Sequence, residues 1–290
     1  MLSVVCSAML SQEITKKIEE FVYAMPRTIQ DIALLLKVNW RTADAYVERI
    51  SKEQGTLGVK TFRGGTKGAL KIVFWRNTER PAASEAQEQL LKKIEAGRKK
   101  EDFSPMDIYQ FVDKKKRRAF SELTDAEEET RDKNIIPLLR QASSEVYIFS
   151  GNLSLANLVH GKISVLDVLE ELARRNVNIK ILTRVDVAGI ENIKKVLAIN
   201  NHVGRDAVEI KYAEQPLRAI VVDNKVARLR EVKSPEKYRA GELKGRTYIY
   251  YEIYEDDWVS WLQKVFWHFF RPAVDARKRI EDLRTIEKLK

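Results

Sequence analysis

Apolar positions near the N-terminus recur at the spacing of an α-helix. Ile14, Ile18, Phe21 and Val22 lie three or four residues apart along the chain, so they fall on one side of a helix. The pattern breaks at residues 25–27, which read Met-Pro-Arg. It therefore predicts a first helix that ends at this break.

Two further helices are predicted from their N-terminal caps. Thr28 and Asp31 have the spacing of a capping box in front of the apolar run at residues 29–36. Asn39 can cap a third helix, which we expect over about residues 40–51. A tight turn separates these two helices.

A β-hairpin is predicted immediately after the third helix. The runs VKTFR (59–63) and ALKIVFW (69–75) are rich in β-branched and aromatic residues, and they flank a glycine-rich turn at residues 64–68. Three short helices followed by a hairpin resemble a winged helix-turn-helix domain. We assign residues 1–78 to this domain.

Residues 79–143 predict a helical connector. Apolar spacing around Leu90 is helical, and Pro105 suits the start of another helix. A dense basic run, KKKRR, occupies residues 114–118. The acidic stretch after Thr124 is typical of a helix N-terminus, where the helix dipole favours negative charge.

From about residue 144 the pattern alternates between strands and helices. Such alternation predicts an α/β sheet covered by helices, and we assign residues 144–290 to this domain. Strands are expected at residues 146–150, 177–183, 208–213, 218–223, 226–232 and 247–255, and helices at 164–176, 189–201 and 256–270.

Composition narrows the partners and the chemistry. The net charge of +10 and the pI of about 9.4 indicate a polyanionic partner. No apolar run approaches the roughly 18 residues that span a bilayer, so we expect no membrane partner. A single cysteine suits a reducing cytoplasm. Three scattered histidines supply no metal-ligand spacing, and no glycine-rich phosphate loop leads into a helix, so we expect no metal or cofactor.

Residues 160–167 read HGKISVLD, which fits H-x-K-x-x-x-x-D, the signature of the phospholipase D superfamily. In enzymes of that superfamily H-x-K lies on a strand, so that both side chains share one face. Here leucines continue at helical spacing beyond the string, and Ser164 and Asp167 form a capping box. We therefore interpret the string as a loop and a helix start, with no catalytic role for His160 or Lys162.

A second string, PLRAIVVD at residues 216–223, has the strand and turn of that superfamily but not its residues. Pro216 stands in place of the histidine and Arg218 in place of the lysine, whereas Asp223 matches. The order of elements over residues 130–270 also resembles a phospholipase D-type domain. The family mechanism needs an imidazole nucleophile, which proline lacks, so we expect no catalytic residue. Arg218 is a candidate anion-binding residue, and the alternative is an ordinary strand residue at the sheet surface.

A winged helix followed by a phospholipase D-type domain without its histidine resembles the archaeal TrmB-type transcription regulators. The resemblance implies a DNA-binding regulator, not an enzyme, whose second domain serves assembly or effector sensing. No segment corresponds to the sugar-binding part of that family. The alternatives are a phospholipase D-type nuclease targeted by its winged helix, an architectural, chromatin-like DNA-binding protein, and an adaptor that contacts the basal transcription machinery.

Duplex DNA is the expected partner, because residues 37–76 hold nine Lys or Arg against three acidic residues. A recognition helix brings its N-terminal residues to base edges in the major groove. Asp44 is expected either to accept a hydrogen bond from cytosine or to pair with Arg41. The candidate contacts are Trp40, Arg41, Thr42 and Asp44 on the third helix, and Arg63, Lys67 and Lys71 on the wing.

The helix expected at residues 256–270 carries six aromatic and aliphatic residues at helical spacing, from Trp258 to Phe269. The default interpretation is that this stripe packs on the chain's own sheet. The alternative is a contact between two copies, since helix-turn-helix proteins commonly bind paired half-sites as dimers. We expect a homodimer.

Overall fold

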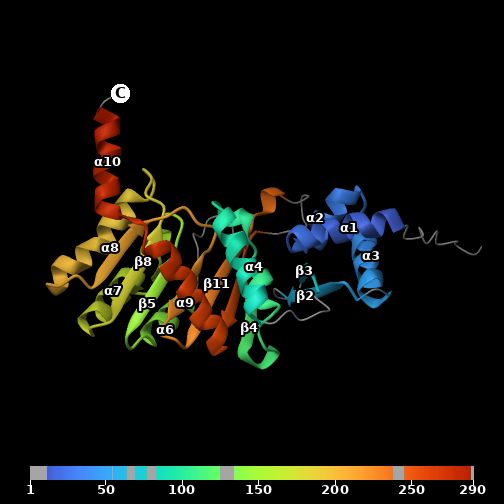
Figure 1. Cartoon of the computed structure of the whole chain (residues 1–290), viewed down its shortest axis with the longest axis horizontal. Coiled ribbons are helices and arrows are strands. Elements are labelled where there is room, and N and C mark those ends of the chain that lie inside the picture. The colour runs from blue at the N-terminus through green and yellow to red at the C-terminus, as the bar shows by residue number, and fades with distance from the viewer. Residues whose placement is uncertain are drawn as a thin grey trace, which may run out of the picture. The chain divides into compact units, whose positions relative to one another are not determined.

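The computed structural model describes residues 12–53, 55–63, 69–76, 83–124, 134–237 and 245–288 (Figure 1). The chain divides into two compact units. The first comprises Met1–Pro81 and Pro235–Leu243, and the second comprises Ala82–Ser234 and Lys244–Lys290.

Helices and a hairpin make up the first unit, in the order that the apolar pattern predicts. Its elements are α1 (Gln12–Ala24), β1 (Arg27–Thr28), α2 (Ile29–Leu36), α3 (Trp40–Glu53), β2 (Leu57–Arg63) and β3 (Ala69–Trp75). The strands form one antiparallel sheet in the order β1-β3-β2. Ile18, Ile32, Val47 and Val73 are fully buried and bring α1, α2, α3 and the hairpin into a single core.

Both predicted helix caps of this unit are present. The amide of Asp31 donates to Thr28 Oγ1 at 3.1 Å, and the amide of Thr28 donates to Asp31 Oδ2 at 2.8 Å, which completes a capping box on α2. Asn39 Oδ1 accepts a hydrogen bond from the amide of Thr42 at 2.9 Å and so caps α3. The start of α3 is therefore fixed by local sequence.

The second unit is a mixed α/β structure built on an eight-stranded sheet. Its strand order is β13-β9-β8-β5-β10-β11-β12-β4, with β5, β8 and β9 parallel and the remaining neighbours antiparallel. The strands are β4 (Arg117–Thr124), β5 (Glu145–Phe149), β8 (Asn178–Thr183), β9 (Val208–Tyr212), β10 (Ala219–Val222), β11 (Val226–Lys233), β12 (Arg246–Ile253) and β13 (Val274–Asp275).

Helices cover both faces of this sheet. Four of them share one apolar core with residues such as Ile148 and Ile220: α6 (Ile135–Arg140), α7 (Val165–Arg174), α8 (Ile190–Val203) and α10 (Ala276–Lys288). Successive strand residues point to opposite faces, and Phe149 lies 5.2 Å from the ring of Phe266 on α9 (Asp256–Phe270). The aromatic stripe of α9 therefore packs on the chain's own sheet, as the default interpretation predicts.

Shorter elements complete the second unit. Helices α4 (Ala83–Ala96) and α5 (Met106–Tyr109) lie in the predicted connector. The remaining elements of this unit are β6 (Val159–His160), β7 (Ile163–Ser164), and the 3₁₀ turns η1 (Lys100–Asp102), η2 (Lys114–Lys116) and η3 (Ser154–Asn157). A further 3₁₀ turn, η4 (Pro235–Lys237), belongs to the first unit. None of the described helices is long and apolar enough to cross a membrane.

The prediction of a purely helical connector is wrong at β4. This strand pairs along its whole length with β12, and Phe120 stacks on Tyr250 with ring centroids 5.1 Å apart. The strand begins within the basic run at residues 114–118, and only a few apolar residues follow in RRAFSELT. The apolar pattern is therefore too short to predict a strand. The helix expected after Thr124 falls outside the described residues. Helix α10 was not predicted, because its sequence is strongly charged and carries few apolar positions.

Candidate functional site

The start of α3 presents two large side chains to solvent. Trp40 is 48% exposed, and the guanidinium of Arg41 lies 5.6 Å from the centre of its ring, in a cation–π contact. The hydroxyl of Thr42 donates to Asn39 Oδ1 at 3.1 Å. Thr42 stays a predicted DNA contact, and in the structure its hydroxyl binds the side chain that caps the helix.

Asp44 and Lys71 form an ion pair between α3 and β3. The ammonium Nζ of Lys71 lies 2.7 Å from both carboxylate oxygens of Asp44 and 3.4 Å from Glu48 Oε1. The hydrogen bond to Asp44 is the main reason why the pKa of Lys71 is raised. The ion pair expected as one alternative for Asp44 is not formed with Arg41: the carboxylate pairs with Lys71, and the guanidinium of Arg41 lies over the ring of Trp40.

The remaining hairpin candidates lie where the structure gives no side-chain detail. Arg63 is the last residue of β2, and its side chain is outside the described set, as is the whole of Lys67. Both stay predictions as DNA contacts.

The string HGKISVLD adopts a hairpin and a helix start. His160 ends β6 and pairs with Ile163 of β7, so His160 and Lys162 do not share a strand. The amide of Ser164 donates to Asp167 Oδ2 at 2.8 Å, and the amide of Asp167 donates to Ser164 Oγ at 3.0 Å. The predicted capping box is confirmed, while the predicted loop before it is a short two-stranded turn.

In PLRAIVVD the proline is enclosed. The strand β10 begins at Ala219, one residue later than predicted, so Pro216 and Arg218 precede it. Pro216 is buried, and it packs closely against Gly97. A side chain at position 97 would clash with the proline ring, because a Cβ there would lie only 2.7 Å from Pro216 Cγ. Gly97, the residue that follows α4, therefore contacts Pro216, which stands where the superfamily pattern has a histidine.

Asp223 has a structural role at the turn between β10 and β11. Its carboxylate accepts hydrogen bonds from the amides of Ser143, Ser144 and Glu145 and from the Ser143 hydroxyl, at 2.8–3.3 Å. Burial opposes ionisation, but these hydrogen bonds outweigh it and lower the pKa of Asp223 to about 2. Asp223 thus ties the start of β5 to this turn, at a backbone φ of 49° that aspartate tolerates.

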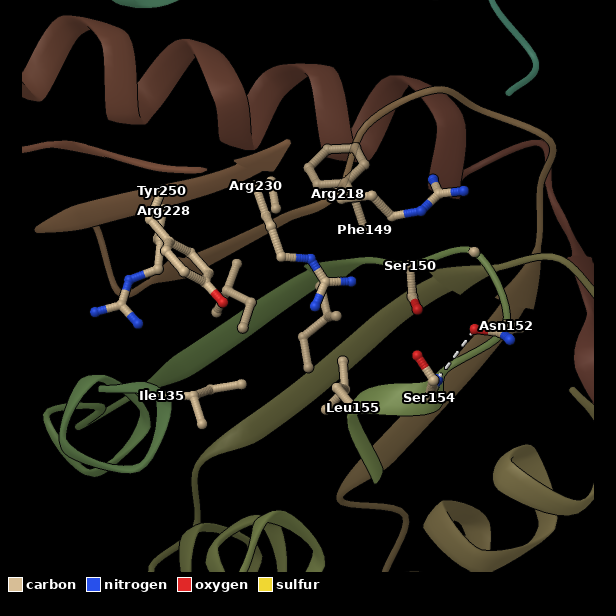
Figure 2. Close-up of a pocket in the computed structure, with 14 residues that line it drawn as sticks. Ile135, Phe149, Ser150, Asn152, Ser154, Leu155, Arg218, Arg228, Arg230 and Tyr250 are labelled. Atoms are coloured by element: carbon tan, nitrogen blue, oxygen red, sulfur yellow. Dashed lines mark hydrogen bonds between the residues drawn. The ribbon is translucent and has the colours of Figure 1, made fainter. Parts of the chain in front are cut away.

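Arg218 lines a small cavity on the face of the sheet that carries α6. The cavity has a volume of about 60 Å³. Its walls come from α6, β5 and the loop after it, η3, and strands β10, β11 and β12, and include Ser150, Arg228 and Arg230 (Figure 2). Arg228 and Arg230 occupy alternate positions of β11, so their side chains share one face. Sequence reasoning singled out Arg218 but missed these two, although their i, i+2 spacing in VARLREV was visible.

The three arginines of the cavity differ in their partners. Arg228 is 5% exposed and forms an ion pair with Glu252, with an Nη2–Oε1 distance of 2.6 Å. Arg218 Nη1 donates to the backbone carbonyls of Leu217 at 2.7 Å and Gln215 at 3.3 Å. In Figure 2 the guanidinium of Arg230 lies amid the lining side chains, whereas that of Arg228 turns away from them.

Burial and like charge act together on Arg218. Burial is the larger effect, and the nearby charges of Arg184 and Arg230 add to it, so that the pKa of Arg218 falls to about 10. Arg218 nevertheless stays protonated at neutral pH. In the described part of the chain, no group of three or more His, Cys, Asp or Glu side chains is arranged to hold a metal ion.

Comparison with known proteins gives distant structural likenesses. No family model matches the sequence, and no curated protein matches it. A phospholipase D family member, Nuc from Salmonella typhimurium, is 11% identical over 55% of this chain and 98% of its own, with a TM-score of 0.39. TrmBL2, an archaeal chromatin protein, is 13% identical over 93% of this chain and 96% of its own, with a TM-score of 0.37. NucT from Helicobacter pylori is 11% identical over 55% of this chain and 99% of its own, also with a TM-score of 0.37. At these values the likenesses decide neither the detailed fold nor the function of this chain.

Proposed function

We propose that this protein is a DNA-binding transcription regulator that holds duplex DNA through its N-terminal unit. In this proposal the unit acts as a winged helix, with α3 as the recognition helix and the β2–β3 hairpin as the wing. The single observation that carries the proposal is the exposed start of α3, where Trp40 and Arg41 lie together in solvent. The N-terminal residues of a recognition helix are those that reach base edges in the major groove.

Charge and rigidity support the same assignment. Residues 37–76 hold six more basic than acidic residues, from nine Lys or Arg against three acids. The caps at Asn39 and Thr28 fix where α3 and α2 begin, and the ion pair between Asp44 and Lys71 ties the hairpin to α3. A basic surface on a rigid helix and hairpin suits a partner whose affinity comes largely from its phosphates.

The second unit has no part in catalysis in this proposal. A histidine nucleophile is replaced by Pro216, which is buried against Gly97, and Asp223 is fully engaged in binding backbone amides. The unit instead serves homodimer formation or effector sensing, and contact with the basal transcription machinery is compatible with either.

Selection of DNA from a random pool tests the proposal. The full chain is mixed with random-sequence duplexes at about 0.15 M salt, and the bound fraction is sequenced. Enrichment of a motif is the expected result. Binding without enrichment would overturn the regulator assignment in favour of an architectural, chromatin-like protein, and absence of binding would overturn both.

Incubation with supercoiled plasmid tests the nuclease alternative. We expect no cleavage by the wild-type chain. Cleavage that disappears in the His160→Ala variant would overturn the non-catalytic assignment, because His160 is the only histidine in the superfamily-like string.

A further inference from the structure

The cavity in the second unit carries positive charge that no described carboxylate pairs with directly. Arg218 and Arg230 both line it, and Arg184 lies close enough to repel Arg218. Within the described ranges, the ion pair formed at this cavity is the one between Arg228 and Glu252, which leaves the other three guanidinium groups without a carboxylate partner. Arg184 also has a buried Nε with no hydrogen-bond partner.

Holding like charges together at a half-buried site is costly unless an anion balances them. The repulsion is strong enough to contribute to the lowered pKa of Arg218. Glu101 offsets it only weakly, and its carboxylate already lies 3.9 Å from the ammonium of Lys100. Binding of a negative ligand would therefore lower the electrostatic free energy of these arginines.

Hydrogen-bond donors accompany the charge. Ser150 Oγ accepts a hydrogen bond from the amide of Leu153 at 3.0 Å, which leaves the hydroxyl of Ser150 able to donate to a ligand. Ser150 and Ser154 line the same cavity as Arg218 and Arg230. Guanidinium groups form strong, charge-assisted hydrogen bonds with phosphate oxygens, and hydroxyl groups can add further donors.

We propose that this cavity binds a small oxyanion of the phosphate type, held mainly by Arg218 and Arg230. The volume of about 60 Å³ and the apolar side walls of Ile135, Ile148 and Leu155 restrict the ligand to a compact group. The residues of this site belong to the second unit, whereas the proposed DNA contact belongs to the first, so the anion proposal stands or falls independently of DNA binding.

Arg230 offers the cleanest variant. Arg218 also donates to two backbone carbonyls, so its removal disturbs the fold as well as the site. No such hydrogen bond is found for the Arg230 guanidinium among the described residues, and its ring contact is with Tyr248 at 5.7 Å. Arg277, an exposed residue of α10, provides a matched control with the same loss of charge.

The experiment is calorimetric titration of the full chain with inorganic phosphate, with chloride at equal ionic strength as the reference. We expect saturable phosphate binding that Arg230→Gln weakens about tenfold or more, the effect of losing one charge-assisted contact, and that Arg277→Gln leaves unchanged. A parallel titration with glycerol phosphate distinguishes an organic phosphate from free phosphate as the ligand. Tighter binding assigns the site to an organic phosphate, and equal or weaker binding assigns it to free phosphate.

The unfolding temperatures of both variants in chloride show whether Arg230→Gln weakens phosphate binding only because it folds poorly. Because Arg230→Gln removes like-charge repulsion, it is expected to unfold at the same temperature as Arg277→Gln or higher when no phosphate is present. Absence of a phosphate-specific signal, unchanged phosphate binding by Arg230→Gln, or a lower unfolding temperature of that variant in chloride would each overturn the proposal.

Discussion

Lys71 and Asp44 are joined across the N-terminal unit, with the Lys71 ammonium 2.7 Å from both carboxylate oxygens of Asp44. The two side chains are 27% and 18% exposed, so the pair is only partly screened by water. It connects β3 to α3, and it removes one cation and one anion from the set of candidate DNA contacts. Removal of the Asp44 carboxylate would therefore raise the net positive charge of this surface by one and leave Lys71 without its main partner.

Asp44→Asn is expected to strengthen duplex binding. The change removes an acidic group beside the proposed DNA contact, and it leaves Lys71 able to contact a phosphate. A new contact worth about 1 kcal/mol would raise the affinity for DNA roughly fivefold. Fluorescence anisotropy with a labelled duplex at fixed salt measures it. Glu20→Gln on α1 serves as the control for loss of one acid, because Glu20 is 69% exposed and pairs with Lys16 on the same helix. Weaker binding by Asp44→Asn would instead support direct recognition of cytosine by Asp44.

Glu252→Gln is expected to destabilise the second unit strongly. It removes the charge that balances Arg228, and both side chains of this pair are 5% exposed. Breaking a buried ion pair by removing one partner costs about 3–5 kcal/mol in the free energy of unfolding. Urea denaturation at neutral pH measures the loss. Glu171→Gln, whose 41% exposed carboxylate pairs with Arg140, is the matched control and should cost less than about 1 kcal/mol.

The stability of the second unit is expected to depend on pH through Asp107. Burial raises the pKa of Asp107 to about 6, although Lys93 opposes the shift and Glu231 adds to it. Because the folded-state pKa lies above the ordinary value of 3.8, the folded protein binds the proton more tightly between about pH 4 and pH 6. The contribution of Asp107 to the free energy of unfolding therefore falls as the pH rises through this window, by about 3 kcal/mol at most.

Comparison with Asp107→Asn isolates this effect from other titrating groups. The variant cannot ionise at this position, so its stability relative to wild type should increase between about pH 4 and pH 7. Urea denaturation of both proteins across this range measures the difference. A difference that stays constant with pH would show that Asp107 titrates normally.

Asp223→Asn is expected to weaken the fold without affecting the anion site. The carboxylate accepts several hydrogen bonds from Ser143, Ser144 and Glu145, and an amide cannot replace the charge that strengthens them. The expected loss is about 1–3 kcal/mol in the free energy of unfolding, measured by urea denaturation at neutral pH. Phosphate affinity should be unchanged, since Asp223 is not among the residues that line the cavity. Loss of phosphate binding in a folded variant would contradict this separation.

Elements with one apolar face could be predicted from the sequence. Helix α7 combines the Ser164–Asp167 capping box with leucines at helical spacing, and α2 combines the Thr28–Asp31 box with an apolar run. In both cases the local sequence and the buried face specify the same element. Strand β4 escaped prediction because it lies at the edge of the sheet and begins in a run of charged residues, so that its backbone pairing with β12 decides its conformation.

The candidate sites could be predicted only in part. The exposed start of α3 follows from one helix and its cap, and Trp40 and Arg41 lie where the sequence places them. The partner of Asp44 is 27 residues away on another element, and the arginines of the cavity meet only because β10 lies between β5 and β11. Such contacts depend on strand order, which local patterns do not encode.

Salt-dependent duplex binding by the wild-type chain and Arg41→Gln tests the central claim most directly. Affinity for a labelled duplex is measured at several salt concentrations, with Lys17→Gln on α1 as the control for loss of one charge. If the start of α3 contacts DNA, the wild type binds with a steep salt dependence, and Arg41→Gln lowers affinity and reduces the logarithmic slope by about one unit for a phosphate contact. If Arg41 reads a base instead, affinity falls by about 1–3 kcal/mol only on selected sequences, with the slope retained. Identical isotherms for wild type and Arg41→Gln at every salt concentration and on every duplex would contradict the account.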